Sequence, residues 1–290
     1  MVVDRKEIVN RHYRLPKILI HSVKMLSLLS TRITVGVLEY FFYRPIKFKV
    51  PEREKIFIMK SEKSHIQVDE IESKIQIYRL RNTGKKILFV HGWNGRAGQF
   101  HRIAEECHEA GFDITAFDLP GHGQSTRKST ALPEIVSAIH GLHEEFGKFD
   151  FVVGHSIGAI AVVNLPRFDM DFDRLVTISL PANDVRSLFS EFVGMFRLPK
   201  KEYTDLLIKG ASEKFNAHPN SFDPGFVCSD IACETLVIHC KDDKDANFNE
   251  SVIFHESLGT SRLHLTAGLG HNRILRDAGV SALISEFFKN

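Results

Sequence analysis

The segment Gly154-His155-Ser156-Ile157-Gly158 constrains the fold of this chain more than any other feature. An apolar run at 151–153 precedes it, and small and apolar residues at 159–161 follow it. This pattern is typical of a buried strand that turns sharply into a helix, because the glycines leave room where backbone segments pass closely. The serine oxygen then projects above the carboxyl end of the strand, where the helix N-terminus favours negative charge. We therefore predict that Ser156 is a nucleophile; a buried serine in a glycine-rich turn is the alternative.

Strands and helices alternate on both sides of this turn. The apolar run within 86–91 is typical of a strand that is buried on both faces. The sequence predicts further strands at 111–117, 149–154, 174–180, 235–239 and 262–266, and helices at 98–110, 131–146, 157–165, 248–256 and 274–288. Short connections between alternating elements favour an α/β fold, with a mostly parallel central sheet and helices on both faces.

The 290 residues suffice for one such domain with additions at two places. Residues 1–45 are predicted to form an N-terminal helical extension, because apolar side chains recur there at helical spacing. Residues 46–290 would form the main domain, which begins with short strands at 55–60, 65–71 and 74–79. The alternation pauses at about 181–229, and we interpret this phenylalanine-rich stretch as a small helical cap.

A serine is a weak nucleophile unless a base lies within hydrogen-bond reach and a third group orients that base. Among the histidines, His271 alone lies in a glycine-rich loop after a late strand, whereas His264 lies within that strand and His255 within a helix. We therefore predict His271 as the base. A cap for the last helix is the alternative role for this residue.

The acid that orients the base should follow the preceding strand, at 235–239. Asp243 is our prediction, and Asp242 is the alternative. Asp245 is better placed to cap the helix that begins near Asn247. Serine, aspartate and histidine then occur in that order along the chain.

Acyl transfer also needs N–H donors for the oxyanion, each worth about 3 kcal/mol to the transition state. One should be the backbone N–H of Ile157, directly after the serine. The other should come from the loop after the strand that ends at His91. We predict the backbone N–H of Trp93, because Gly92 lets the backbone approach closely.

These motifs together resemble the α/β-hydrolase superfamily. They comprise residues 91–93, 117–125 and 154–158, Asp243, and Gly270-His271, and they follow the family's order over about residues 75–288. The resemblance implies an α/β-hydrolase fold with a small helical cap and an esterase- or lipase-like serine triad. It also implies that Asp118 and His122 belong to a structural turn beside the pocket.

Two departures from the family's pattern bear on the site. Cys240 stands where the family usually has glycine, and Ala246-Asn247 stands where it has a hydrophobic residue and proline, which leaves Asp242 open as the acid. Dehalogenases and epoxide hydrolases of this fold have aspartate in the strand-to-helix turn, at the position that Ser156 occupies here. The serine therefore disfavours those reactions.

We expect a serine hydrolase that acts on a carboxylic ester or thioester with an apolar acyl group, through an acyl-enzyme on Ser156. An acyltransferase with the same triad, or a non-catalytic binding protein on a hydrolase fold, is the alternative. This chemistry needs neither a metal ion nor an organic cofactor. The cap residues either line an acyl pocket or pack the cap onto the sheet; they are Phe189, Phe192, Met195 and Phe196.

The net charge and the cysteine content limit which partners and which cellular location we expect. The net charge of +2 gives no field for nucleic acid. The four cysteines lack the spacing of a disulfide scaffold or a zinc site, so we expect free thiols and a cytoplasmic location. The small-molecule substrate is the expected partner, and the oligomeric state is not predicted.

The N-terminal helical segment carries positive charge. Lys17, His21, Lys24 and Arg32 lie mostly off its apolar stripe, and no acid occurs between Glu7 and Glu39. A basic amphipathic helix of this kind can lie on an anionic membrane surface. The alternative is a helix that packs against the main domain or a partner subunit.

Overall fold

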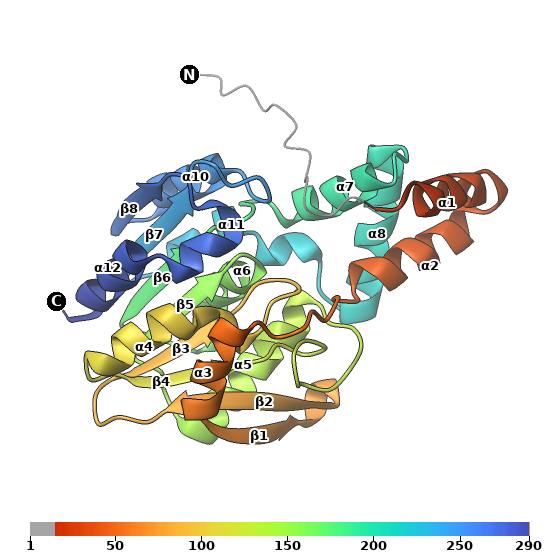
Figure 1. The fold of residues 1–290 in the computed structure, drawn as a ribbon. Coiled ribbons are helices and arrows are strands. Elements are labelled where there is room, and N and C mark those ends of the chain that lie inside the picture. The colour runs from red at the N-terminus through yellow and green to blue at the C-terminus, as the bar shows by residue number, and fades with distance from the viewer. Residues whose placement is uncertain (1–14, 290) are drawn as a thin grey trace.

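An eight-stranded sheet forms the centre of the computed structural model, which describes residues 15–289 (Figure 1). The strands are β1 (Glu62–Val68), β2 (Ser73–Leu80), β3 (Lys86–Val90), β4 (Asp113–Phe117), β5 (Phe151–His155), β6 (Arg174–Ile178), β7 (Glu234–Cys240) and β8 (Ser261–Thr266). Their order is β1-β2-β4-β3-β5-β6-β7-β8. Only the β1–β2 and β2–β4 pairs are antiparallel, which confirms the predicted α/β fold with a mostly parallel sheet.

Helices cover both faces of this sheet. One face carries α3 (Glu52–Lys60), α4 (His101–Glu109) and α12 (Ala278–Lys289), and the other carries α5 (Leu132–Phe146), α6 (Ile157–Val163) and α10 (Phe248–Ser257). The central strands are buried over nearly their whole length: all residues of β4 and β5 are buried, and in β3, β6 and β7 all but the first residue are buried. Strands of this kind have no polar face, which is why their sequences are continuous apolar runs.

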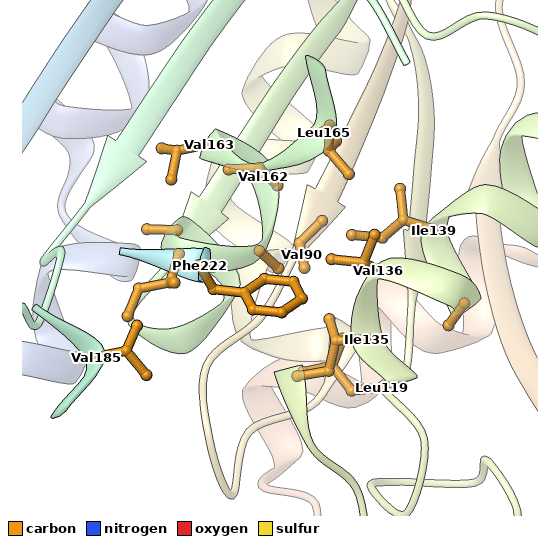
Figure 2. Packing of buried hydrophobic residues seen from close by; sticks show 14 of the residues in the cluster. Val90, Leu119, Ile135, Val136, Ile139, Val162, Val163, Leu165, Val185 and Phe222 are labelled. Carbon is orange, nitrogen blue, oxygen red and sulfur yellow. The ribbon is translucent and has the colours of Figure 1, made fainter. Parts of the chain in front are cut away.

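The cap insertion lies between β6 and β7. It contains α7 (Val185–Met195), α8 (Lys200–Phe215) and the short α9 (Pro224–Val227). Figure 2 shows the Phe222 ring of this insertion pointing toward Val90 of β3 and Ile135 of α5. The side-chain amide of Asn164 donates a hydrogen bond to the carbonyl oxygen of Phe222 at 3.1 Å. The cap therefore shares one hydrophobic core with the sheet.

Two helices precede the sheet domain, α1 (Lys17–Leu29) and α2 (Thr31–Phe42), and we call them the N-terminal hairpin. The sequence predicted one helical segment here, but Ser30 interrupts it in an extended conformation and caps α2 by accepting a hydrogen bond from the Ile33 N–H. Part of the predicted segment, residues 1–14, lies outside the described residues. Within residues 15–289, no helix is both long and apolar enough to cross a bilayer.

The strand predicted at 55–60 is wrong, because these residues belong to α3. A continuous apolar run as short as 56–59 cannot distinguish a strand from a helix. Pro51 precedes the helix, and Glu52 and Glu54 lie in its first turn, where acidic side chains favour helix formation. Phe57 is fully buried, and Glu54 forms an ion pair with Arg96 in the loop after β3. α3 therefore packs beside the site.

The strand predicted at 65–71 begins and ends later in the sequence than the observed strand. β1 runs over Glu62–Val68, and residues 69–71 form a 3₁₀ turn. The pairing register with β2, in which Glu62 lies opposite Arg79, sets the true start of the strand. The local sequence pattern of residues 65–71 cannot predict this cross-strand partner.

Candidate active site

The strand-to-helix turn at Ser156 has the geometry that its sequence predicts. β5 ends at His155, α6 begins at Ile157, and Ser156 has φ 55° and ψ −123°. A positive φ costs a non-glycine residue about 1–3 kcal/mol and persists only where the surrounding structure imposes it. A Cβ on Gly158 would lie 2.3 Å from the carbonyl oxygen of Val90, so only glycine fits there. The fold therefore holds Ser156 in a strained turn at the carboxyl end of the sheet.

His271 and Asp243 meet beside this turn. His271 lies on α11 (Gly270–Arg273), a short helix where the sequence predicted a loop, and its Nδ1–H donates to Oδ2 of Asp243 at 2.8 Å. Asp242 is exposed instead, and its Oδ2 accepts a hydrogen bond from the Gly268 N–H at 2.6 Å. The structure thus brings Asp243, and not Asp242, to the histidine.

The prediction that Asp245 caps a helix is wrong. The cap of α10 is Asn247, whose side chain accepts a hydrogen bond from the Asn249 N–H at 3.1 Å. The backbone N–H of Asp245 donates instead to Oδ1 of Asp243 at 2.8 Å, and the Ala246 N–H donates to the same oxygen at 3.0 Å. Two backbone N–H groups of the turn after β7 thus hold the carboxylate of Asp243 in place.

A second histidine, His239 at the end of β7, also contacts Asp243. Its Nε2 lies 3.2 Å from Oδ2 of Asp243, and its Nδ1 accepts from the Ser251 hydroxyl at 2.7 Å. Burial disfavours ionisation of Asp243, but hydrogen bonds from His239 and His271 and from the Ala246 N–H outweigh it. They hold the pKa of this carboxyl well below its usual range. Asp243 is therefore a carboxylate that is fixed from several sides.

His239 is not among the predicted site residues, although its spacing of four residues from Asp243, across a strand end, is a usable signal. His155 was not predicted either; it is buried and donates from Nε2 to the backbone oxygen of His271 at 3.0 Å. Burial holds the pKa of His155 well below its usual range, and a proton gained by the neighbouring His271 would lower that pKa further. Through this hydrogen bond, a neutral His155 links the turn at Ser156 to the helix that carries His271.

Two more buried histidines shape the loop after β3. Nε2 of His91 accepts from the Leu119 N–H at 2.9 Å, and its Nδ1–H donates to the Gly92 carbonyl at 2.8 Å. Nε2 of His122 accepts from the Asn94 N–H at 3.1 Å. Burial lowers the pKa of both imidazoles to about 3, so both are neutral and each ring can accept one hydrogen bond and donate another.

Asp118 supports the same loop from the turn after β4. Its carboxylate accepts from the Ala97 N–H at 2.9 Å and from the Gln124 N–H at 2.8 Å. Gly92 passes so close to the elbow that a Cβ on it would lie 2.9 Å from Cβ of Ser156. The loop that contains Trp93 is thus held directly beside the serine.

A cavity of about 530 Å³ opens at this point, and Ser156, Ile157, Trp93 and His271 all line it. No hydrogen bond joins the Ser156 hydroxyl to His271 within residues 15–289, and such bonds are often long before substrate binds. Ile157 is the first residue of α6, so its N–H has no acceptor within that helix.

The cavity walls are largely aromatic and aliphatic. Four cap residues were expected either to line an acyl pocket or to pack the cap onto the sheet. Phe189 and Phe192 line the cavity, whereas Phe196 is fully buried and Met195 packs against the core. The N-terminal segment contributes as well, since Phe41, Phe42 and Tyr43 line the cavity. Phe42 stacks on Phe189 with 4.5 Å between ring centroids. The apolar wall therefore combines two segments that are far apart in the sequence.

Asp243, Asp245 and His271 also offer potential metal-ligand atoms within 4.8 Å of one another. Both oxygens of Asp243 and Nδ1 of His271 already make hydrogen bonds with each other or with the backbone. This arrangement suits an imidazole that is oriented for proton transfer better than it suits a cation.

Comparison with known proteins agrees with this geometry. A model of the alpha/beta hydrolase family matches residues 87–283, and the chain belongs to this family. A comparison with curated proteins finds no match.

Solved structures of similar fold include three whose sequences differ widely from this one. They are an esterase from Exiguobacterium antarcticum (17% identity, TM-score 0.61, covering 79% of this chain and 100% of that one), the Pyrococcus furiosus esterase Pf2001 (18%, 0.64, 84% and 98%) and a bromoperoxidase from Bacillus anthracis (19%, 0.60, 79% and 100%). At these identities the likeness establishes the fold alone, and function must be argued from the site.

Proposed function

We propose that the protein is a serine-type hydrolase that cleaves a carboxylic ester or thioester with an apolar acyl group. The observation that carries the proposal is the Asp243–His271 hydrogen bond at the edge of the cavity that Ser156 lines. The nucleophile and the base then line one space, and the group that orients the base is hydrogen-bonded to the base. The apolar wall of the cavity supports the acyl preference, because acyl chains gain free energy on leaving water.

In the proposed mechanism, Oγ of Ser156 attacks the carbonyl carbon, and Nε2 of His271 takes the hydroxyl proton. The N–H groups of Trp93 and Ile157 stabilise the oxyanion. When the carbon–oxygen or carbon–sulfur bond breaks, His271 returns the proton to the leaving group. A water molecule, deprotonated by His271, then attacks the acyl-enzyme and frees the acid and Ser156. Asp243 keeps the imidazole in the tautomer that can accept a proton at Nε2.

Labelling with a fluorophosphonate tests this proposal directly. The wild type should react at one serine, and Ser156→Ala should not react. Ser179→Ala is a matched control, because Ser179 is a second serine with a positive φ (53°) at the end of a neighbouring strand, and this variant should react like the wild type. An inert wild type, or a Ser156→Ala variant that still reacts, would overturn the assignment.

Nitrophenyl esters of graded chain length test the acyl preference. Burial of one methylene contributes about 0.8 kcal/mol, so kcat/KM should rise about fourfold per added methylene until the cavity is full. A flat profile would contradict the apolar acyl pocket. Acyl transfer would use the same groups, and an added alcohol that takes most of the acyl product in place of water would favour it over hydrolysis.

A further inference from the structure

The N-terminal hairpin presents two different faces to its surroundings. One face packs on the cap, where Val23 and Leu38 are buried and Phe42 stacks on Phe189. Figure 1 shows α1 and α2 extending past α7 and α8, away from the sheet. The structure therefore bears out the packing alternative for one side of these helices and leaves their other side unexplained.

The other side is apolar and exposed. On α1, Ile18, Met25 and Leu29 follow a helical stripe and are 78%, 61% and 81% exposed. On α2, Ile33 and Tyr40 are more than half exposed. Single exposed apolar side chains are ordinary, but a series along two adjacent helices marks an interaction surface.

The charge on the hairpin is positive. Over residues 17–42 the cations are Lys17, Lys24 and Arg32, and all three are exposed. The acid in this range is Glu39, which faces the cap: a Cβ on Gly210 of α8 would lie 2.3 Å from its Oε1. The exposed side thus combines large apolar side chains with basic ones, which is the composition of helices that lie in the headgroup region of anionic bilayers.

This surface leads to the cavity that contains Ser156. Phe41, at the end of α2, and Phe48, in the segment after it, line the cavity and are 38% and 53% exposed. Apolar side chains therefore continue from the hairpin to the cavity entrance. A substrate with an acyl chain could pass from a bilayer to the serine without crossing water.

We propose that the N-terminal hairpin docks on the surface of an anionic lipid bilayer and turns the cavity entrance toward it, so that the acyl substrate enters from the membrane. The docking is inferred from the residues of the hairpin alone. The entry of substrate from the membrane rests in addition on the proposed function. A second copy of this chain fits the surface less well, because a two-fold interface would bring the same basic residues together without acids to pair with them.

Co-sedimentation of the full chain with vesicles tests the docking. The wild type should pellet with vesicles of phosphatidylcholine mixed with phosphatidylglycerol, and much less with phosphatidylcholine alone. The double variant Met25→Glu/Leu29→Glu should bind at least about tenfold more weakly, since it places carboxylates on the apolar stripe. Ile253→Glu on α10 is the matched control, because Ile253 is an exposed isoleucine outside the hairpin (43% exposed), and it should bind like the wild type.

A second pair of variants tests the charge. A basic residue near an anionic surface contributes about fivefold to binding, so Lys24→Gln/Arg32→Gln should weaken it about 25-fold. Lys63→Gln/Lys74→Gln removes two exposed cations from β1 and β2, which lie at the bottom of Figure 1 away from the hairpin, and should leave binding unchanged.

The same variants separate this proposal from the proposed function. Ser156→Ala should pellet like the wild type, and Met25→Glu/Leu29→Glu should hydrolyse a short, soluble nitrophenyl ester at the wild-type rate but a vesicle-borne ester more slowly. A wild type that stays in solution with anionic vesicles would overturn the docking, as would hairpin variants that bind equally well. Sedimentation velocity that shows a dimer which Met25→Glu/Leu29→Glu dissociates would assign the surface to a second copy instead.

Discussion

Asp243 and Asp242 are neighbours in sequence, and exchanging each for asparagine separates their roles. In Asp243→Asn the amide oxygen should occupy the Oδ1 position, where the Asp245 and Ala246 N–H groups donate. The amide NH₂ then faces His271, whose Nδ1 must accept instead of donate. Nε2 of His271 consequently carries the proton and cannot take one from Ser156.

The expected loss in kcat for Asp243→Asn is about 10⁴-fold, the scale on which a wrong histidine tautomer costs a serine triad. Asp242→Asn should keep at least about half of the wild-type kcat, because its oxygen can still accept from the Gly268 N–H at an exposed position. The assay is nitrophenyl ester hydrolysis under saturating substrate. An Asp243→Asn variant that keeps a tenth of the wild-type rate, or an Asp242→Asn variant that falls equally far, would refute this assignment of roles.

The same substitution should affect stability. Asparagine loses the charge-assisted hydrogen bonds from His239 and His271, so we expect a cost of about 3 kcal/mol in the free energy of unfolding at pH 7. The folded-state pKa of Asp243 lies below the unfolded value of about 4. Its contribution is therefore complete above that value and is lost as the pH falls toward the folded pKa. The difference between wild type and variant should be fully present at neutral pH and shrink below about pH 4, as measured by urea unfolding.

Two further substitutions test how the site is held. Gly158→Ala should cost at least about 3 kcal/mol and abolish activity, since its Cβ would meet the Val90 carbonyl oxygen at 2.3 Å. Gly36→Ala lies at a helical glycine whose would-be Cβ has no atom within 4 Å, apart from its own helix turn, among residues 15–289. It should instead stabilise by about 1 kcal/mol, and thermal unfolding compares the two. Glu54→Gln should cost about 3 kcal/mol because it leaves the buried Arg96 without its partner, and an added Arg96→Met change should recover part of the loss.

Local patterns in the sequence carried much of the architecture. A strand that is buried on both faces must be apolar throughout, and a sharp strand-to-helix turn needs glycine where chains pass closely, so residues 151–158 could be interpreted without a partner. The α3 segment shows the limit of such patterns. The short apolar run at 56–59 fits a strand or a helix equally well. The burial of Phe57 and the Glu54–Arg96 ion pair, which decide for the helix, depend on contacts with distant segments.

The sharp turn at Ser156 and the order of serine, aspartate and histidine were determined by the sequence itself, because the turn is a local structure and the order is read along the chain. The placement of Asp243 rather than Asp242 beside His271 was decided only by the tertiary structure, since it depends on how two loops meet at the sheet edge. The same holds for the support that His155 and His239 give to the pair, and for the N-terminal hairpin, whose Phe42 completes a cavity wall with Phe189. The His155–His271 and Phe42–Phe189 contacts join residues that are separated by more than a hundred positions, and no local pattern encodes them.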